Sequence, residues 1–197
     1  MNTRIADIDS QVFLDVFCRS CIYWEEPGAF RTASAPDPDR PAHPCAGRSH
    51  TVSPTEAEKI KSAWFDAKSA ILGPCGKLLY ADGVPAAYCQ YAPPAHLPRI
   101  GEYQGLAAKV DPEAVFISCL YVREGYVGKG LGSRLLREVI EECRELGRPA
   151  VETFARDDSD NNCSGPTAFY VRHAFAVVAT ETMPGGTFSL VRLQLHE

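Results

Sequence analysis

The sequence predicts a mixed α/β domain, because runs with strand periodicity alternate with runs with helix periodicity. Residues 114–122 form a β-rich, mostly apolar run, which is typical of a strand buried on both faces. Residues 131–146 repeat apolar side chains at steps of three and four, with charged side chains on the other face, which indicates an amphipathic helix. Gly147 and Pro149 end that helix, and residues 150–155 resume a strand-like pattern. The centre of the fold is therefore a strand, a loop, a helix and a second strand.

The other elements are predicted by helix caps and turn signals. Two amphipathic helices are expected in the first third of the chain, one starting after Asp9 or Ser10 and one opened by residues 51–54. Two β-hairpins complete the sheet. They pair residues 75–81 with 84–91 across Asp82-Gly83, and residues 175–180 with 187–195 across Pro184-Gly185-Gly186.

Length and composition indicate a single domain over residues 1–197. A chain of 197 residues with 45% hydrophobic content can bury one substantial core, so no second domain is needed. Residues 27–54 hold six prolines and two glycines. Such a composition resists regular structure, and we expect a long surface loop there.

Charge and hydropathy exclude some classes of partner. The net charge is -5, and no long run of lysine and arginine is present to neutralise a phosphate backbone, so nucleic acid is not an expected partner. The first residues lack the apolar core of a signal peptide, and no apolar run approaches the length that spans a membrane. The sequence therefore predicts a cytoplasmic protein with no membrane partner.

Eight cysteines raise the question of a metal site. Cys18 and Cys21 have ligand-like spacing and could join His43 and Cys45 around zinc, but no second pair of tight spacing follows. The other cysteines fall mostly within apolar patterns, where cysteine behaves as a small core residue. We expect reduced thiols and no metal.

Residues 125–132 form a glycine-rich loop between the central strand and its helix. Gly128, Gly130 and Gly132 stand at every second position, so successive backbone amides can converge on one anion without side chains in the way. The helix that follows adds its positive end. The loop is therefore a candidate phosphate site, and a glycine-rich turn without a ligand is the alternative.

Two common phosphate loops do not fit this sequence. A Walker A loop requires Lys-Ser/Thr after its second glycine, but Leu131-Gly132 follows Gly130. A Rossmann fingerprint would have Ser133 in place of its third glycine, and no acidic residue closes the next strand at the expected distance. Nucleoside triphosphate hydrolysis and dinucleotide binding are therefore not favoured. The alternative that the loop binds another phosphate ligand, as part of a regulatory module, stays open.

Two segments resemble motifs of the GNAT N-acetyltransferase superfamily. Residues 127–132, Val-Gly-Lys-Gly-Leu-Gly, are similar to its acyl-CoA pyrophosphate loop, written Arg/Gln-x-x-Gly-x-Gly/Ala, with Val127 in place of Arg or Gln. Residues 168–175 resemble its Phe-Tyr-x-Lys-x-Gly-Phe ending, with Tyr170 at the tyrosine and Ala174 at the glycine. The resemblance covers about residues 114–195. Residues 88–94, Pro98-Arg99 and the pair Val151-Glu152 resemble stretches in a poorly characterised bacterial branch of the superfamily.

The resemblance implies a fold and an activity. The fold would be the acyl-CoA N-acyltransferase fold, with a mixed, mostly antiparallel sheet of about six to seven strands, flanked by helices and splayed between residues 114–122 and 150–155. The activity would be transfer of an acetyl group from acetyl-CoA, as co-substrate, to a primary amine by direct attack in a ternary complex. The acceptor would be a small-molecule or peptide amine, and because members often pair, a homodimer is possible.

The resemblance also assigns residues to the cofactor. Backbone N–H groups at the end of the central strand would meet the acetyl carbonyl, loop amides would bind the pyrophosphate, and an asparagine would contact CoA. The expected cofactor-binding residues are Leu120, Tyr121, Val122, Val127, Gly128, Lys129, Gly130, Leu131, Gly132, Ser133, Asn162 and Tyr170.

Acyl transfer to an amine also needs proton transfers. In the family, the tyrosine that corresponds to Tyr170 can protonate the leaving thiolate. Glu152 is the carboxylate nearest the expected splay, so it is the candidate base, directly or through water, with pairing to Arg148 or Arg156 as the alternative.

Other interpretations remain open. Cys119 could act as a nucleophile that forms an acyl-enzyme, or be a core residue. The chain could also be a non-catalytic acyl-CoA sensor. Residues 23–26, Tyr-Trp-Glu-Glu, could line an acceptor pocket or pack in the core, and His173 is expected at the surface or at a helix end.

Overall fold

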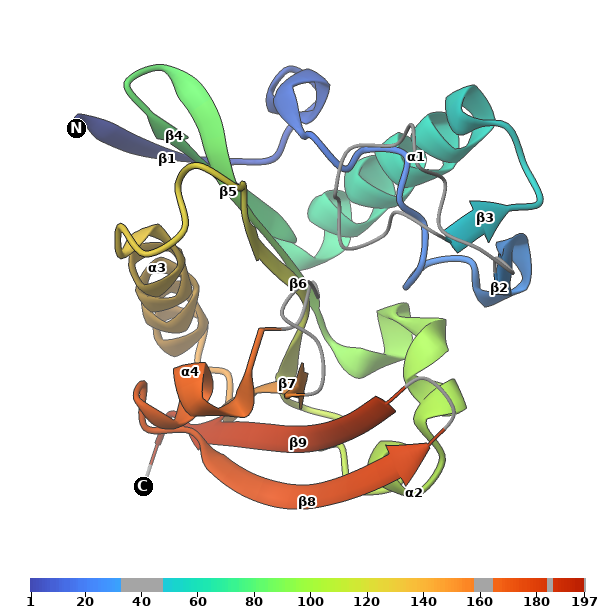
Figure 1. Ribbon diagram of the computed structural model, residues 1–197, viewed down its shortest axis with the longest axis vertical. Coiled ribbons are helices and arrows are strands. Elements are labelled where there is room, and N and C mark those ends of the chain that lie inside the picture. Colours follow the sequence, from blue (N-terminus) through green and yellow to red (C-terminus); the bar gives the residue numbers. More distant parts are fainter. Residues whose placement is uncertain (33–47, 158–164, 184–185, 197) are drawn as a thin grey trace.

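The computed structural model describes residues 1–32, 48–157, 165–183 and 186–196, and a seven-stranded sheet runs through its centre (Figure 1). The strand order is β1, β4, β5, β6, β7, β9, β8. All neighbours are antiparallel except β6 and β7, which are parallel. The predicted α/β class with a mixed, mostly antiparallel sheet is confirmed. The strands are β1 (Thr3–Asp7), β4 (Gly76–Ala81), β5 (Val84–Ala92), β6 (Val115–Val122), β7 (Ala150–Arg156), β8 (Ala176–Met183) and β9 (Gly186–Gln194).

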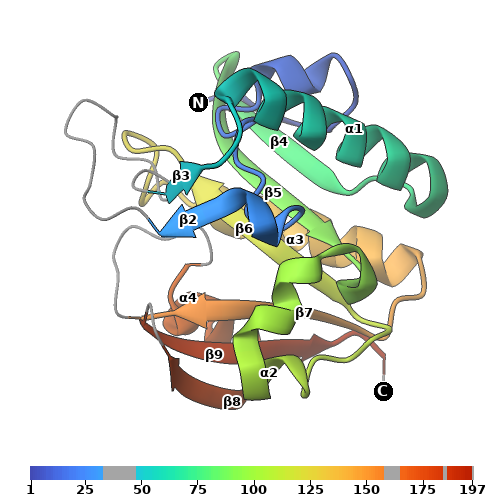
Figure 2. The same ribbon diagram turned by 90° about the vertical axis from the view of Figure 1, so that its right-hand side faces the viewer.

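Two long helices cover opposite faces of the sheet (Figures 1 and 2). Helix α3 (Leu131–Glu145) follows the glycine loop and buries its apolar stripe, as its periodicity predicts. Helix α1 (Pro54–Leu72) begins at Ser53, whose hydroxyl accepts a hydrogen bond of 3.2 Å from the amide of Glu56. No helix in the described part of the chain is both long and apolar enough to cross a membrane. The shorter helical segments are η1 (Val12–Asp15), η2 (Pro27–Ala29), η3 (Pro94–His96), η4 (Pro98–Tyr103), α2 (Gln104–Ala107) and α4 (Thr167–Val171).

The first of the two expected helices is only the single 3-10 turn η1. Its N-cap is Gln11, which makes no side-chain cap bond, but the Oδ1 of Asp9 accepts hydrogen bonds of 2.9 and 2.8 Å from the amides of Gln11 and Val12. The backbone is already extended at Val16. β-Branched and aromatic residues favour a helix only weakly, so burial of Phe13 and Val16 against the sheet decides the path of the chain.

The proline-rich stretch at residues 27–54 contains two short strands, one near each end. The short strands β2 (Phe30–Thr32) and β3 (Arg48–His50) pair antiparallel outside the main sheet. Residues 33–47, the middle of the expected loop, lie outside the described residues.

Strands β6 and β7 diverge, which creates the opening predicted for this sheet. They pair only at Val115 with Val151 and at Phe116 with Glu152. Beyond that point the Thr153 hydroxyl donates a hydrogen bond of 2.8 Å to the carbonyl of Ile117, while β7 continues along β9. Among the described strands, the second half of β6 therefore has a partner only on its β5 side.

A bulge in β6 lies at the start of this opening. Gln90 of β5 pairs with Cys119, but the next residue, Tyr91, pairs with Ile117. Ser118 is therefore the extra residue, and its hydroxyl donates a hydrogen bond of 3.2 Å to the carbonyl of Gln90. The bulge bends β6 where it leaves β7.

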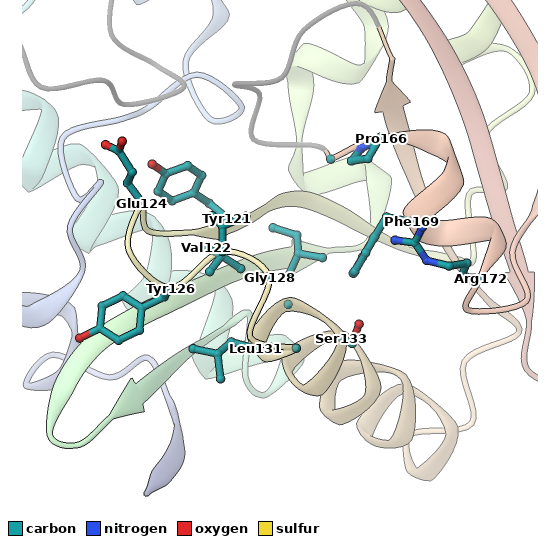
Figure 3. Close-up of a pocket in the computed structure, with 15 residues that line it drawn as sticks. Tyr121, Val122, Glu124, Tyr126, Gly128, Leu131, Ser133, Pro166, Phe169 and Arg172 are labelled. Carbon is teal, nitrogen blue, oxygen red and sulfur yellow. The ribbon is translucent and has the colours of Figure 1, made fainter. Parts of the chain in front are cut away.

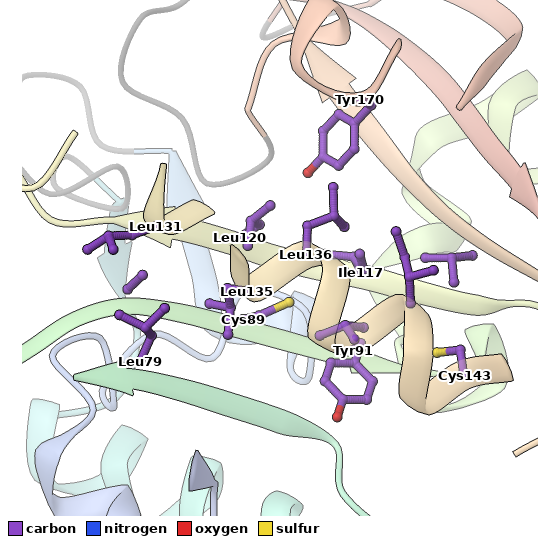
Figure 4. Close-up of a cluster of buried hydrophobic side chains, with 14 of the residues drawn as sticks. Leu79, Cys89, Tyr91, Ile117, Leu120, Leu131, Leu135, Leu136, Cys143 and Tyr170 are labelled. Carbon is purple, nitrogen blue, oxygen red and sulfur yellow. The ribbon is translucent and has the colours of Figure 1, made fainter. Parts of the chain in front are cut away.

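The largest hydrophobic cluster fills the space between α3 and the sheet (Figure 4). Leu135, Leu136 and Val139 of α3 are fully buried in it, against side chains of β5 and β6. Tyr170 of α4 closes one end of this cluster. The packing therefore holds the start of α3, and the glycine loop before it, beside the diverging end of β6.

Candidate functional site

A cavity of about 660 Å³ lies where β6 leaves β7. It is lined by the end of β6, the glycine loop, the first turn of α3 and the segment that holds α4 (Figure 3). Elements that are separate in the sequence thus border the same cavity.

Most of the expected cofactor residues border this cavity, whereas Lys129 and Tyr170 do not line it directly. Asn162 lies outside the described residues. The expected residues that line the cavity are Leu120, Tyr121, Val122, Val127, Gly128, Gly130, Leu131, Gly132 and Ser133.

The glycines of the loop are required for two different reasons. Gly125, Gly128 and Gly130 have φ angles of 46°, 79° and 76°, in the left-handed region that side chains disfavour. Gly132 is in the helix, where an added Cβ would lie 3.3 Å from Cγ2 of Val122. The first three glycines therefore shape the loop, and the fourth lets α3 approach β6.

The backbone amides of the loop are free to bind a ligand. In the described part of the chain, no hydrogen-bond acceptor meets the N–H group of any residue from Val127 to Ser133. The first amide that is satisfied within the helix is that of Arg134, which donates to the carbonyl of Gly130 at 3.0 Å. Free amides at a helix N-terminus form a site for a phosphate group. The loop thus has the donors that an anion cradle requires.

The end of β6 offers further donors to the cavity. The amide of Arg123 donates a hydrogen bond of 2.9 Å to Ala86, on the β5 side. Because neighbouring residues of a strand point their amides in opposite directions, the amide of Tyr121 also faces β5, and those of Leu120 and Val122 face the opening. This corrects the expectation for Tyr121, which can offer the cavity its side chain but not its N–H group.

Tyr170 is fully buried under the wall of the cavity. A Cβ added to Gly165, which lines the cavity, would lie 3.9 Å from the Tyr170 hydroxyl. Figure 4 shows this hydroxyl pointing toward Leu120 and Leu136. Burial raises the pKa of Tyr170, so the phenol stays protonated at neutral pH and can serve as a proton donor.

Glu152 does not occupy the position expected of a base. It lies at the paired end of β6 and β7, is fully buried and does not line the cavity. Its Oε1 accepts a hydrogen bond from Arg192, and its Oε2 accepts one of 3.0 Å from the amide of Asp111. Burial raises the pKa of Glu152, and Arg192 opposes this effect. Both oxygens are engaged, so the carboxylate holds β7, β9 and the chain before β6 together.

The cysteines show no metal site in the described part of the chain. Cys18 and Cys21 form no disulfide, and no described group of histidine, cysteine and acidic side chains could hold a metal ion. His43 and Cys45 lie outside the described residues. Cys119 packs with the residues of the α1 face, opposite to α3, and does not line the cavity.

Residues 23–26 contribute more to the core than to the cavity. Trp24 stacks on Tyr103 with 5.7 Å between ring centroids. Glu25 is buried, and its Oε1 lies 2.5 Å from the Lys61 ammonium, which also donates to Gln90 at 2.5 Å. This buried cluster joins the segment after η1 to α1 and to β5. Its position next to the β6 bulge makes it a support of the site.

Several residues at the cavity were not expected as site residues from the sequence, and three of them are relevant to ligand binding. Phe169 and Arg172 line it from the α4 side, and His173 reaches Ser133 behind it. Arg172 stands where the Phe-Tyr-x-Lys pattern has its lysine, so the pattern contained a signal for it. No sequence signal joins His173 to Ser133, because forty positions separate them.

Comparison with known proteins identifies a family that the sequence of this chain matches. The sequence model described as the acetyltransferase (GNAT) family matches residues 40–175. The comparison with curated proteins finds no match for this chain.

Solved structures with the same fold include several acetyltransferases. An N-acetyltransferase from Staphylococcus aureus Mu50 is 15% identical with a TM-score of 0.61, and 100% of each chain is covered. The protein yncA from Salmonella typhimurium, solved with its cofactor acetyl-CoA, is 21% identical with a TM-score of 0.57, covering 100% of this chain and 96% of that one. The PaiA N-acetyltransferase from Thermoplasma acidophilum, solved with coenzyme A, is 13% identical with a TM-score of 0.55, covering 98% and 99%.

Proposed function

Because the chain belongs to the GNAT family of acetyltransferases, we propose that it moves the acetyl group of acetyl-CoA to a primary amine by direct attack in a ternary complex. The observation that supports this most is the row of free amides from Val127 to Ser133 beside a cavity of about 660 Å³. Two proteins with the same fold were solved with acetyl-CoA or CoA.

The co-substrate has a natural position in this site. Its pyrophosphate would accept hydrogen bonds from the amides of residues 128–133, at the positive end of α3. Its pantetheine arm would lie along the open side of β6, where the amides of Leu120 and Val122 take the place of a missing strand partner. The thioester would then lie near the β6 bulge, with Tyr170 close to the sulfur.

The chemistry follows from these positions. The amine nitrogen attacks the thioester carbon, and an N–H group of β6 stabilises the negative charge that develops on the carbonyl oxygen. As the carbon–sulfur bond breaks, Tyr170 donates its proton to the thiolate. The amine loses its proton to water, because Glu152 is held by Arg192 and Asp111 away from the cavity.

The first test is whether the loop binds CoA. Replacing Gly130, at a φ of 76°, by Glu places a carboxylate where the pyrophosphate would be, and we expect titration calorimetry to show at least about 100-fold weaker binding of acetyl-CoA. Gly147→Glu is the matched control, because Gly147 has a φ of 67° but lies at the far end of α3. If the Gly130 variant bound acetyl-CoA as tightly as the control variant, the loop assignment would be wrong.

A nucleophilic Cys119 is the competing mechanism. Direct attack predicts that Cys119→Ala keeps most of its turnover, measured as free thiol released from acetyl-CoA in the presence of an amine panel. It also predicts that no acetyl group stays on the parent protein, as judged by mass spectrometry after incubation with acetyl-CoA alone. Loss of turnover together with an acetylated thiol in the parent would establish the acyl-enzyme route. Binding of acetyl-CoA without any thiol release would instead indicate a sensor.

We also propose the cytoplasm as the location and a small-molecule or peptide amine as the acceptor. None of the six cysteines in the described part of the chain forms a disulfide, which suits a reducing compartment. A homodimer is part of the same proposal, to be measured by light scattering.

A further inference from the structure

The glycine loop lacks a side-chain donor at its first position. Val127 is 69% exposed and has no polar atom in its side chain, although the resembling motif has Arg or Gln there. The Lys129 ammonium does not replace it, because it lies 5.2 Å from the centroid of the Tyr126 ring and Lys129 does not line the cavity. A pyrophosphate bound by the loop alone would meet backbone amides but no cationic side chain.

Helix α4 places a cation at the same cavity. Arg172, directly after α4, is the one positively charged residue among the described residues that line the cavity. No ion pair in the described part of the chain occupies its guanidinium. Figure 3 shows Arg172 and Phe169 on the α4 side, with Ser133 of α3 on the other. An unpaired arginine at a cavity can bind a phosphate through two parallel hydrogen bonds.

His173, the next residue, meets the hydroxyl of Ser133. Its Nε2 lies 2.9 Å from Ser133 Oγ, and its ring packs on Phe169 with 5.0 Å between centroids. If Nε2 carries a proton, it donates to Oγ and leaves the Ser133 hydroxyl proton free for a ligand. If Nε2 is unprotonated, the hydroxyl donates to the imidazole instead. The proton on His173 therefore decides whether Ser133 can be a donor to the cavity.

We propose that α4 completes the phosphate site, with Arg172 binding the pyrophosphate of CoA and His173 holding the Ser133 hydroxyl as a further donor to it. This inference rests on the proposed function, because it requires CoA in the cavity. Arg172 acts by direct contact, and His173 is a positioning residue that acts through Ser133.

The arrangement couples binding to protonation. The groups that face His173 are Ser133 and Arg137 of α3, and Phe169 and Arg172 of the α4 segment. Burial and the two arginines lower the pKa of His173 in the free protein. A bound pyrophosphate neutralises the arginines and favours the imidazolium, so the pKa of His173 rises on binding. At a pH of about 6.5, the usual imidazole pKa, binding must then take up protons.

The test of Arg172 compares three ligands by titration calorimetry. Against Arg172→Ala, we expect CoA and dephospho-CoA to bind about 10- to 100-fold more weakly than to the parent, and pantetheine to bind equally to both. Arg144→Ala is the control, because Arg144 is an exposed arginine in the last turn of α3, pairs with Glu141 and does not line the cavity.

Two results would overturn the assignment of Arg172. One is an unchanged affinity of Arg172→Ala for CoA. The other is a loss that disappears with dephospho-CoA, which would place the arginine on the 3′-phosphate instead of the pyrophosphate. A parent protein that bound neither CoA nor dephospho-CoA would overturn the proposed function itself.

The test of His173 measures protons. Titration of dephospho-CoA, which lacks the phosphate monoester that titrates near pH 6, at a pH of about 6.5 in two buffers of different ionisation enthalpy should show proton uptake by the parent and none by His173→Gln. The glutamine can still donate to Ser133, so its affinity should stay within about threefold of the parent. Ser133→Ala and His173→Ala should each weaken binding, and the double variant should be no weaker than Ser133→Ala. Proton uptake that persists in His173→Gln, or losses that add in the double variant, would refute the role of His173.

Discussion

At the scale of single residues, environment decides the role of each titratable group at the site. Tyr170 and Glu152 are both fully buried, and burial raises the pKa of each. The Tyr170 hydroxyl lies under the cavity wall, next to Gly165, whereas both oxygens of Glu152 are engaged by Arg192 and Asp111. A donor beside the cavity can take part in catalysis, and a carboxylate that is fully bonded elsewhere supports the fold.

Replacing Tyr170 by Phe tests the first role. We expect turnover to fall by about 100-fold or more, because the thiolate loses its acid, with acetyl-CoA affinity within about threefold of the parent. The raised pKa also has a consequence for pH. The phenol of the parent stays protonated up to at least about pH 10, so turnover should show no loss from tyrosine ionisation below that pH. A profile that falls between pH 7 and 9 in the parent, but not in Tyr170→Phe, would contradict this assignment.

Replacing Glu152 by Gln tests the second role. The amide keeps the shape but loses the ion pair with Arg192, so we expect the free energy of unfolding to fall by about 2–4 kcal/mol. Turnover per folded molecule should stay within about threefold at a temperature where the variant is folded. A stable variant with turnover reduced by about 100-fold would restore Glu152 as a base.

At the scale of elements, the site depends on how segments are tied together. Glu25 follows η1, Lys61 lies in α1 and Gln90 lies in β5, and these three buried side chains form one cluster. The carbonyl of Gln90 also accepts from Ser118 at the bulge of β6. Among the described residues, Glu25 Oε2 has no hydrogen-bond partner. The buried negative charge of Glu25 therefore depends on the ammonium of Lys61 for its compensation. The cluster connects the α1 face to the strand that borders the cavity.

Removing Lys61 should therefore destabilise the protein strongly. Lys61→Met leaves the Glu25 carboxylate buried without its cation, and we expect a loss of about 3–5 kcal/mol in the free energy of unfolding, measured by urea denaturation. Lys59→Met is the matched control on the same helix, because the Lys59 side chain is 73% exposed, and it should change stability by less than about 0.5 kcal/mol. Adding Glu25→Gln to Lys61→Met should recover part of the loss. Equal effects of the two lysine variants would show that the buried ion pair contributes nothing to stability.

At the scale of the whole molecule, the cavity exists because the sheet opens. Strand β7 pairs with β9 along its length but with β6 at only two positions, so the end of β6 offers its amides to the cavity. Helix α3 brings the glycine loop to this opening, and α4 borders it from the other side. The catalytic tyrosine, the phosphate cradle and the thioester amides that we propose thus come from three elements that meet only in the folded chain.

Local pattern alone was enough to predict the central unit of this fold. The apolar run of β6, the three- and four-residue steps of α3 and the glycines between them are short-range features, and each depends on residues within one or two turns. The same local signals placed the hairpin at Asp82-Gly83 and the start of α1 within residues 51–54. They were less reliable for η1, where burial of Phe13 and Val16 outweighed a weak helix preference.

Only the tertiary structure decided which side chains share the cavity. Glu152 lies on a strand next to β6 in both sequence and space, yet Arg192, forty positions away, binds its carboxylate. His173 and Ser133 are also forty positions apart, and the packing of α4 beside α3 brings them to 2.9 Å. The periodicity of a sequence predicts which face of a helix or strand is buried. It does not predict which other element covers that face. That choice is made by strand pairing and helix packing over the whole chain, and so the chemistry of the site could be located by sequence but not completed by it.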